Sequence, residues 1–237
     1  MPKSPLPKVQ GLERDAFEKA RRALMRRDPV LAPVIRKYRQ RSLVDGPVVD
    51  PFPALVRTIT AQQISTKAAA TIHGRLVALM PGGVATPEGL LALTDEQMRQ
   101  AGLSRQKTAY LRDLAAKVAS GELPVHTLDA MTDDEVIEAI VKVKGLGRWS
   151  AEMFLMFRLR RPDVLPVDDL GIVNAIMRLY KLRKKPKADR IRKIGEAWRP
   201  YRTVACWYLW RSLENTKDTK GTKDTKDAKN AKEQRVG

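Results

Sequence analysis

Hydrophobic positions along this chain recur mostly at the three-to-four-residue spacing of amphipathic helices, and the alternation typical of strands is nearly absent. The pattern predicts helices over residues 15–27 and 105–120, and further apolar helical faces over 136–143 and 170–179. Residues 61–64 are expected to form a short polar break between two helices. Side chains that can accept the first backbone N–H groups mark several helix starts: Ser65, Thr86, Thr94, Ser104 and Thr132. The sequence therefore predicts an all-α fold.

A glycine pair separates two apolar helical patterns within residues 135–159. Gly145 and Gly147 flank Leu146, and Arg148 opens the second helix. Glycines allow a tight turn with positive φ, and N–H groups at a helix start suit a phosphate. Taken alone, this spacing fits an ordinary αα-corner as well as an anion-binding hairpin.

The charge of the chain is strongly positive but unevenly distributed. The 237 residues include 45 Lys and Arg and 27 Asp and Glu, a formal net charge of +18. Residues 1–50 carry 12 basic and 6 acidic side chains, 51–170 carry 14 of each, and 171–214 carry 12 and 3. A polyanion is the expected partner. Residues 215–237, with lysine at every third position, are interpreted as a disordered, solubilising tail.

Composition excludes several other classes of protein. Cys206 is the single cysteine, which excludes internal disulfides, Cys-cluster zinc sites and a four-Cys iron–sulfur cluster. No run of residues reaches the length of a membrane span, and the first residues lack an apolar signal segment. We expect a protein of the cytoplasm, associated with the nucleoid if the source is bacterial, with no membrane partner.

Several motifs in order resemble one family. Residues 143–151, Val-Lys-Gly-Leu-Gly-Arg-Trp-Ser-Ala, resemble the helix-hairpin-helix signature, with Lys144 where proline is usual. Residues 165–172, with Asp169, resemble the segment that carries the catalytic aspartate in helix-hairpin-helix (HhH-GPD) DNA glycosylases. Residues 59–65 look like the Gln-containing loop of the alkylpurine branch, that of bacterial 3-methyladenine DNA glycosylase II. We expect no counterpart of the N-terminal α/β domain of that branch's best-known members.

The resemblance assigns the catalytic role to Asp169. A carboxylate at a helix N-terminus stays ionised, and beside C1′ it stabilises the sugar cation that forms as the N-glycosidic bond breaks. Asp168 is the competitor, but the family's Asp-x-x-Ile spacing favours Asp169, and both residues also suit simple helix capping. Bifunctional members have a lysine where this chain has Trp149, so the resemblance implies a monofunctional enzyme that leaves an abasic site.

The resemblance also implies the residues that contact the substrate. Trp149 and Trp210 match aromatic pocket positions that stack on a cationic alkylated purine such as 3-methyladenine or 7-methylguanine, and Met153 replaces a pocket tyrosine. Gln62 and Gln63 lie in the DNA-intercalating loop, with Gln63 where relatives have an apolar wedge. We expect the DNA backbone to be held at the hairpin by Lys144, Gly145, Leu146, Gly147 and Arg148. Trp198 and Trp207 are expected in the core.

The expected architecture is two helical lobes with an active-site cleft between them. One lobe is residues 51–165 and contains the hairpin; the other joins 1–50 to 166–214 and is basic. The expected enzyme is monomeric, flips an alkylated base out of double-stranded DNA and uses no cofactor, apart from a monovalent cation that the resemblance implies at the hairpin backbone. The alternatives are a noncatalytic helix-hairpin-helix DNA-binding module, and an RNA-binding or scaffolding protein with adhesive charge.

Overall fold

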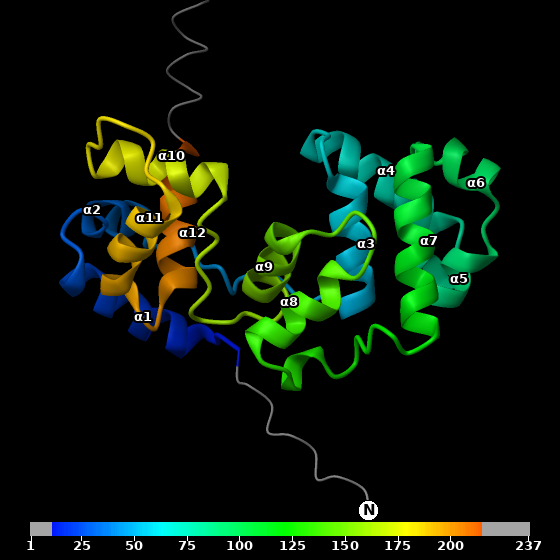
Figure 1. Ribbon diagram of the computed structural model, residues 1–237, viewed down its shortest axis with the longest axis horizontal. Coiled ribbons are helices and arrows are strands. Elements are labelled where there is room, and N and C mark those ends of the chain that lie inside the picture. The colour runs from blue at the N-terminus through cyan, green and yellow to red at the C-terminus, as the bar shows by residue number, and fades with distance from the viewer. Residues whose placement is uncertain (1–10, 215–237) are drawn as a thin grey trace, which may run out of the picture. The chain divides into compact units, whose positions relative to one another are not determined.

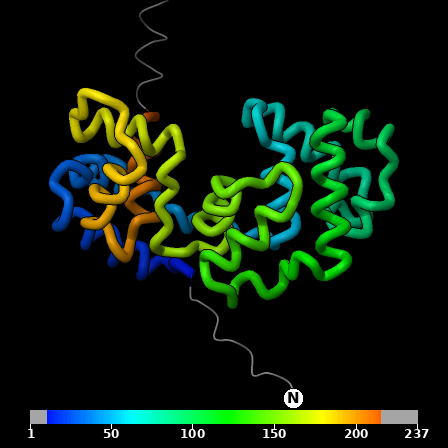
Figure 2. The backbone as a smooth tube through the Cα atoms, in the orientation of Figure 1, coloured from blue at the N-terminus to red at the C-terminus, as the bar shows by residue number. Residues whose placement is uncertain are grey.

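The computed structural model of the chain describes residues 11–214, so the predicted tail at 215–237 lies outside the described residues. The described part is helical and contains no strand, which confirms the predicted all-α fold (Figures 1 and 2). Its helices are α1 (Arg14–Arg27), α2 (Ala32–Lys37), α3 (Pro51–Ala61), α4 (Thr66–Ala78), α5 (Pro87–Ala92), α6 (Asp95–Gln100), α7 (Arg105–Ala119), α8 (Asp133–Val141), α9 (Arg148–Phe157), α10 (Leu170–Leu179), α11 (Ala188–Gly195) and α12 (Arg202–Ser212). Three one-turn 3-10 helices cover Pro81–Gly83, Leu128–Ala130 and Glu196–Trp198.

The predicted helix starts are confirmed by their hydrogen bonds. Thr94 and Thr132 each form a complete capping box, in which the N-cap hydroxyl and the third helical residue satisfy each other's backbone N–H groups. Ser65, Thr86 and Ser104 accept backbone N–H groups at the starts of α4, α5 and α7. The break between α3 and α4 spans residues 62–65, within one residue of the expected 61–64. Local side-chain chemistry therefore sets the starts of these five helices.

The chain divides into two compact units. The middle unit comprises residues 46–164 and also takes in Leu12, whose backbone N–H donates to the Arg160 carbonyl at 2.7 Å. The terminal unit comprises residues 13–45 and 165–214. The boundaries between the expected lobes lie at 50/51 and 165/166, whereas the boundaries between the units lie at 12/13, 45/46 and 164/165. None of the helices between residues 11 and 214 is long and apolar enough to cross a membrane.

The middle unit packs α3 against α4, α7 and α9, with α5 along α7 and α8 beside α9. The core of this unit consists of apolar side chains that are fully buried, and the removal of their surface from water stabilises the fold. These residues come from five helices: Leu55, Ile59, Leu76, Leu90, Met98 and Leu111. The core thus holds the α3–α4 break and the hairpin on one scaffold.

The terminal unit packs α12 against α1, α2 and α10. Trp198 and Trp207 are buried, as predicted, and Phe17 meets the Trp207 ring edge-to-face with centroids 5.9 Å apart. Asp28 is also buried and accepts hydrogen bonds from the Trp198 indole N–H at 2.6 Å and from the Tyr180 hydroxyl. Burial, together with this bond to the carboxylate, raises the pKa of Tyr180. This core fixes α12 relative to the start of α10.

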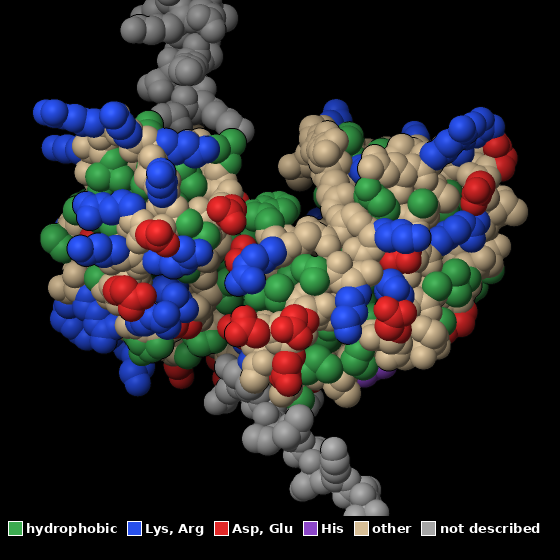
Figure 3. Space-filling model, viewed as in Figure 1, with side chains coloured by type: hydrophobic (Ala, Val, Ile, Leu, Met, Phe, Trp, Pro, Cys, Tyr) green, Lys and Arg blue, Asp and Glu red, His purple; other side chains and the backbone are tan. Residues whose placement is uncertain are grey.

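Figure 3 shows Lys and Arg side chains gathered on this unit.

Candidate active site and nucleic-acid interface

Asp169 is the N-cap of α10 and is 8% exposed. Its Oδ1 accepts the Ile172 backbone N–H at 2.8 Å, the local bond expected of a capping aspartate. The same oxygen accepts the indole N–H of Trp210, on α12, also at 2.8 Å. Two N–H donors and the helix N-terminus therefore stabilise the negative charge and fix the orientation of the carboxylate.

Gly171 allows Trp210 to reach this carboxylate. A Cβ at position 171 would lie 2.8 Å from Cδ1 and 2.9 Å from Nε1 of the Trp210 ring, closer than such atoms approach. The glycine inside the first turn of α10 is therefore required by the ring above it. Asp168, the competing carboxylate, is exposed. The terminal unit thus provides one buried, oriented carboxylate, with the partly exposed indole of Trp210 beside it.

The hairpin between α8 and α9 has one glycine in the left-handed region. Gly145 has φ +81°, and a Cβ there would lie 2.1 Å from Cδ2 of Tyr110, so the hairpin packs directly on that ring. Gly147 has φ −99° and is the N-cap of α9, so the positive φ of the turn is adopted by Gly145 and not by Gly147. A Cβ at Gly147 would point into open space. This glycine leaves room at the surface of the hairpin.

The other hairpin residues have divided roles. Leu146 is buried and its N–H donates to the Val143 carbonyl at 3.1 Å, so this residue shapes the turn. The backbone N–H of Lys144 donates to Asp113 Oδ2 at 2.8 Å, and its side-chain Nζ lies 3.9 Å from the other oxygen. Arg148 forms an ion pair with Glu152 one turn along α9, at 3.2 Å. Since the first N–H groups of a helix have no partner within it, those at the start of α9 can bind an anion.

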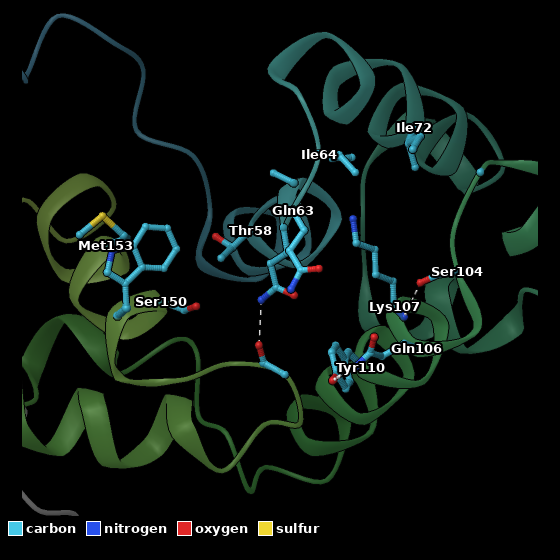
Figure 4. A pocket seen from close by; sticks show the side chains of 15 residues that line it. Thr58, Gln63, Ile64, Ile72, Ser104, Gln106, Lys107, Tyr110, Ser150 and Met153 are labelled. Atoms are coloured by element: carbon cyan, nitrogen blue, oxygen red, sulfur yellow. Dashed lines mark hydrogen bonds between the residues drawn. The ribbon is translucent and has the colours of Figure 1, made fainter. Parts of the chain in front are cut away.

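A groove of about 830 Å³ in the middle unit brings the predicted loop and the pocket residues of α9 together. In Figure 4, Gln63 lies centrally, with Met153 and Ser150 on one side and Lys107 on the other. Trp149 also lines the groove and is 47% exposed. The structure therefore groups Gln62, Gln63, Trp149 and Met153 in the middle unit, whereas Asp169 and Trp210 form a pair in the terminal unit.

Two polar side chains hold the loop between α3 and α4. The Gln62 amide Nε2 donates to the Gly145 carbonyl at 2.8 Å, which ties the loop to the hairpin (dashed in Figure 4). Lys107 Nζ donates to the carbonyl of Thr60, in the last turn of α3, at 2.7 Å. Partial burial lowers the pKa of Lys107. Gln63 follows with φ 58° and an exposed side chain. The hydrogen bonds of Gln62 and Lys107 thus hold the chain just before Gln63, whose exposed side chain projects from the loop.

Sequence reasoning missed the part that α7 plays here. Gln106, Tyr110 and Asp113 lie at i, i+4 and i+7, on one face of α7, and that face supports the hairpin. The spacing is visible in the sequence, but it shows only that the three side chains share a face. Within residues 11–214 no group of three or more His, Cys, Asp or Glu side chains could hold a metal ion.

Comparisons with known proteins agree with this geometry. Residues 56–200 match the model of the HhH-GPD superfamily base excision DNA repair proteins. The chain is 37% identical over 162 residues to DNA-3-methyladenine glycosylase 1 of Schizosaccharomyces pombe, covering 68% of this chain and 71% of that protein. It is 32% identical over 231 residues to the DNA-3-methyladenine glycosylase of Saccharomyces cerevisiae, covering 80% and 77%.

Solved structures are similar over most of their length. The S. pombe 3-methyladenine DNA glycosylase in complex with abasic DNA has a TM-score of 0.70 at 33% identity, covering 83% of this chain and 97% of that one. A DNA-3-methyladenine glycosidase from Bacillus halodurans has a TM-score of 0.71 at 36% identity, covering 84% and 91%. Since the family model matches more than half of the sequence, and the helix-hairpin-helix and the capping aspartate are both present in the fold, the chain belongs to the HhH-GPD superfamily of base excision DNA repair proteins.

Proposed function

We propose that this protein is a monofunctional DNA glycosylase of base excision repair. It takes an alkylated purine of the 3-methyladenine or 7-methylguanine type out of duplex DNA, hydrolyses the N-glycosidic bond and leaves an abasic site. The observation that carries the proposal is the Asp169 carboxylate, buried at the start of α10 and oriented by Trp210. The relatives named DNA-3-methyladenine glycosylases support the substrate class.

The chemistry needs one fixed anion. As the bond from C1′ to the purine nitrogen breaks, the base leaves with the electron pair and the sugar becomes cationic. Asp169 stabilises that cation and orients a water, whose oxygen bonds to C1′ while its proton passes to the carboxylate or to solvent. An alkylated purine is already cationic and departs as a neutral base, so the reaction requires no general acid.

The absence of a lyase step follows from the position of the amines. Bifunctional members of the family form the Schiff base with a lysine two residues after the second hairpin glycine, where this chain has Trp149. Lys107 donates to a backbone carbonyl of α3, and Lys144 lies beside Asp113. Water is therefore the nucleophile.

The base is recognised by stacking and the DNA by its backbone. Trp149 and Trp210 each present a ring that can stack on a cationic purine, with Met153 as a softer pocket wall beside Trp149, and such a ring contact favours the charged base by about 0.5–2 kcal/mol. Gln63 fills the gap left by the flipped nucleotide. The start of α9 and the hairpin bind phosphates. The enzyme acts as a monomer in the compartment that holds the DNA; it uses no cofactor, and a monovalent cation at the hairpin carbonyls is a separate prediction.

Asp169→Asn tests the proposal, because asparagine keeps the shape and can still accept both N–H groups while the charge is lost. We expect base release from methylated duplex DNA to fall by at least about 100-fold, the scale of a lost electrostatic group, with DNA binding retained. Asp168→Asn is the matched control, since it removes the same charge one residue earlier from an exposed side chain. An active Asp169→Asn protein would refute the mechanism, and a wild-type protein that binds DNA without releasing any base would favour the noncatalytic module.

A further inference from the structure

The turn between α10 and α11 and the helix that follows it concentrate positive charge. Residues 178–193 contain nine Lys and Arg side chains and a single acidic one, Asp189. We call these residues the basic turn. All nine cationic side chains are exposed: Arg178, Lys181, Arg183, Lys184, Lys185, Lys187, Arg190, Arg192 and Lys193. Figure 3 shows Lys and Arg gathered on the terminal unit, to which this segment belongs.

Within the described residues 11–214, one ion pair neutralises part of this charge. The Asp189 carboxylate is taken by Arg192, at 2.7 Å. The other eight cations have no ion pair within residues 11–214, although ion pairs are present elsewhere in the terminal unit, as between Arg41 and Glu214. Like charges this close repel and destabilise the segment. Binding of an external polyanion would remove that repulsion.

The basic turn presents cationic side chains but no large apolar side chain and no aromatic ring that could contact a ligand. Ile191 is buried, and Leu179, Leu182 and Pro186 are only partly exposed, so the segment presents no exposed large apolar side chain that could enter a membrane. Tyr180, the aromatic residue of the segment, is half-buried and its hydroxyl donates to Asp28, so its ring is not presented for stacking on bases. A surface of this kind recognises a regular array of phosphates and is indifferent to base sequence.

We propose that the basic turn is a second DNA-binding surface, which holds undamaged duplex DNA through its phosphates. The proposal rests on the proposed function, because duplex DNA is then the polyanion that the protein meets. Contacts to phosphates alone form equally well with and without a lesion. The surface therefore raises affinity for undamaged DNA and the rate of lesion encounter, and leaves the chemical step unchanged.

The test compares two full-length triple variants that lose the same charge. One carries Lys184→Gln, Lys185→Gln and Lys187→Gln in the basic turn; the other carries Lys19→Gln, Arg22→Gln and Arg26→Gln, exposed positions on α1. Binding of an undamaged 25-bp duplex is measured by fluorescence anisotropy between 50 and 300 mM NaCl. At 100 mM salt we expect the basic-turn variant to bind at least about 10-fold more weakly, with the slope of log K against log salt reduced by about 2–3, since each phosphate contact contributes about 0.9.

The same variants separate this proposal from the proposed function. Single-turnover release of 7-methylguanine at saturating enzyme should stay within about twofold of wild type for the basic-turn variant, whereas Asp169→Asn abolishes it while binding persists. Equal losses of binding in both triple variants would overturn the proposal, because net charge would then explain them. The proposal would also be overturned if the basic-turn variant bound duplex DNA as well as wild type but lost binding to an RNA hairpin or to phosphatidylserine vesicles. That result would assign the surface to another partner.

Discussion

Trp210→Phe separates two roles of the same ring. Phenylalanine keeps an aromatic face at position 210 but removes the indole N–H that donates to Asp169 Oδ1 at 2.8 Å. A hydrogen bond to a charged group is worth about 1.5–3 kcal/mol, and each 1.36 kcal/mol is tenfold in rate, so loss of its orienting effect should slow catalysis about 10- to 150-fold. The bond from Ile172 to the carboxylate remains and position 210 is partly exposed, so the free energy of unfolding should fall by less than it would for a fully buried tryptophan.

The assay is single-turnover release of 7-methylguanine from a methylated duplex, with enzyme in excess and binding measured in parallel. Trp207→Phe is the matched control, because the same atoms are removed three residues earlier on α12 from a ring that packs on Phe17 in the core. That variant should lower the melting temperature and leave the saturated rate nearly intact. If Trp210→Phe slows the reaction by less than about threefold, the ring acts by stacking alone and the orienting role is wrong.

Three further predictions concern the core, the loop and pH. Asp28→Ala should lower the free energy of unfolding in urea by about 3–5 kcal/mol, because a buried indole N–H and two backbone N–H groups lose their acceptor; a loss below 1 kcal/mol would contradict this. Gln62→Leu removes the bond to the Gly145 carbonyl and should slow base release about 5-fold, with binding of undamaged duplex retained; equal losses in both measurements would instead assign Gln62 to DNA contact. Burial, and secondarily the positive charge of Arg57, lower the pKa of His73 in the folded protein. The contribution of neutral His73 to folding stability is therefore fully present above about pH 6.5, the ordinary pKa of histidine, and is lost as the pH falls below that value. Melting temperatures between pH 7.5 and 5 should therefore fall less steeply in His73→Gln, and identical slopes would exclude this role.

The sequence was most informative where structure depends on neighbours within one helical turn. The capping boxes at Thr94 and Thr132, and the caps at Ser65 and Ser104, were predicted because a side chain three residues from an N–H group reaches it without help from the rest of the fold. The expectation that Trp198 lies in the core is also confirmed, and its indole N–H donates to buried Asp28. The glycine pair shows the limit of such reasoning, because the sequence does not tell which glycine adopts positive φ: Gly145 does, and Gly147 is an extended N-cap.

By itself, then, the sequence determined the helices, the hairpin and a capping aspartate at position 169, because periodicity and i to i+3 hydrogen bonds are local. Only the tertiary structure decided that Trp210 orients that carboxylate, that Gln62 ties its loop to Gly145, and that Tyr110 lies beneath the hairpin. These partners are 35 to 83 residues apart in the chain. They meet because the burial of apolar helix faces brings the helices together, and no residue spacing along the chain specifies which side chains then come within 3 Å of each other.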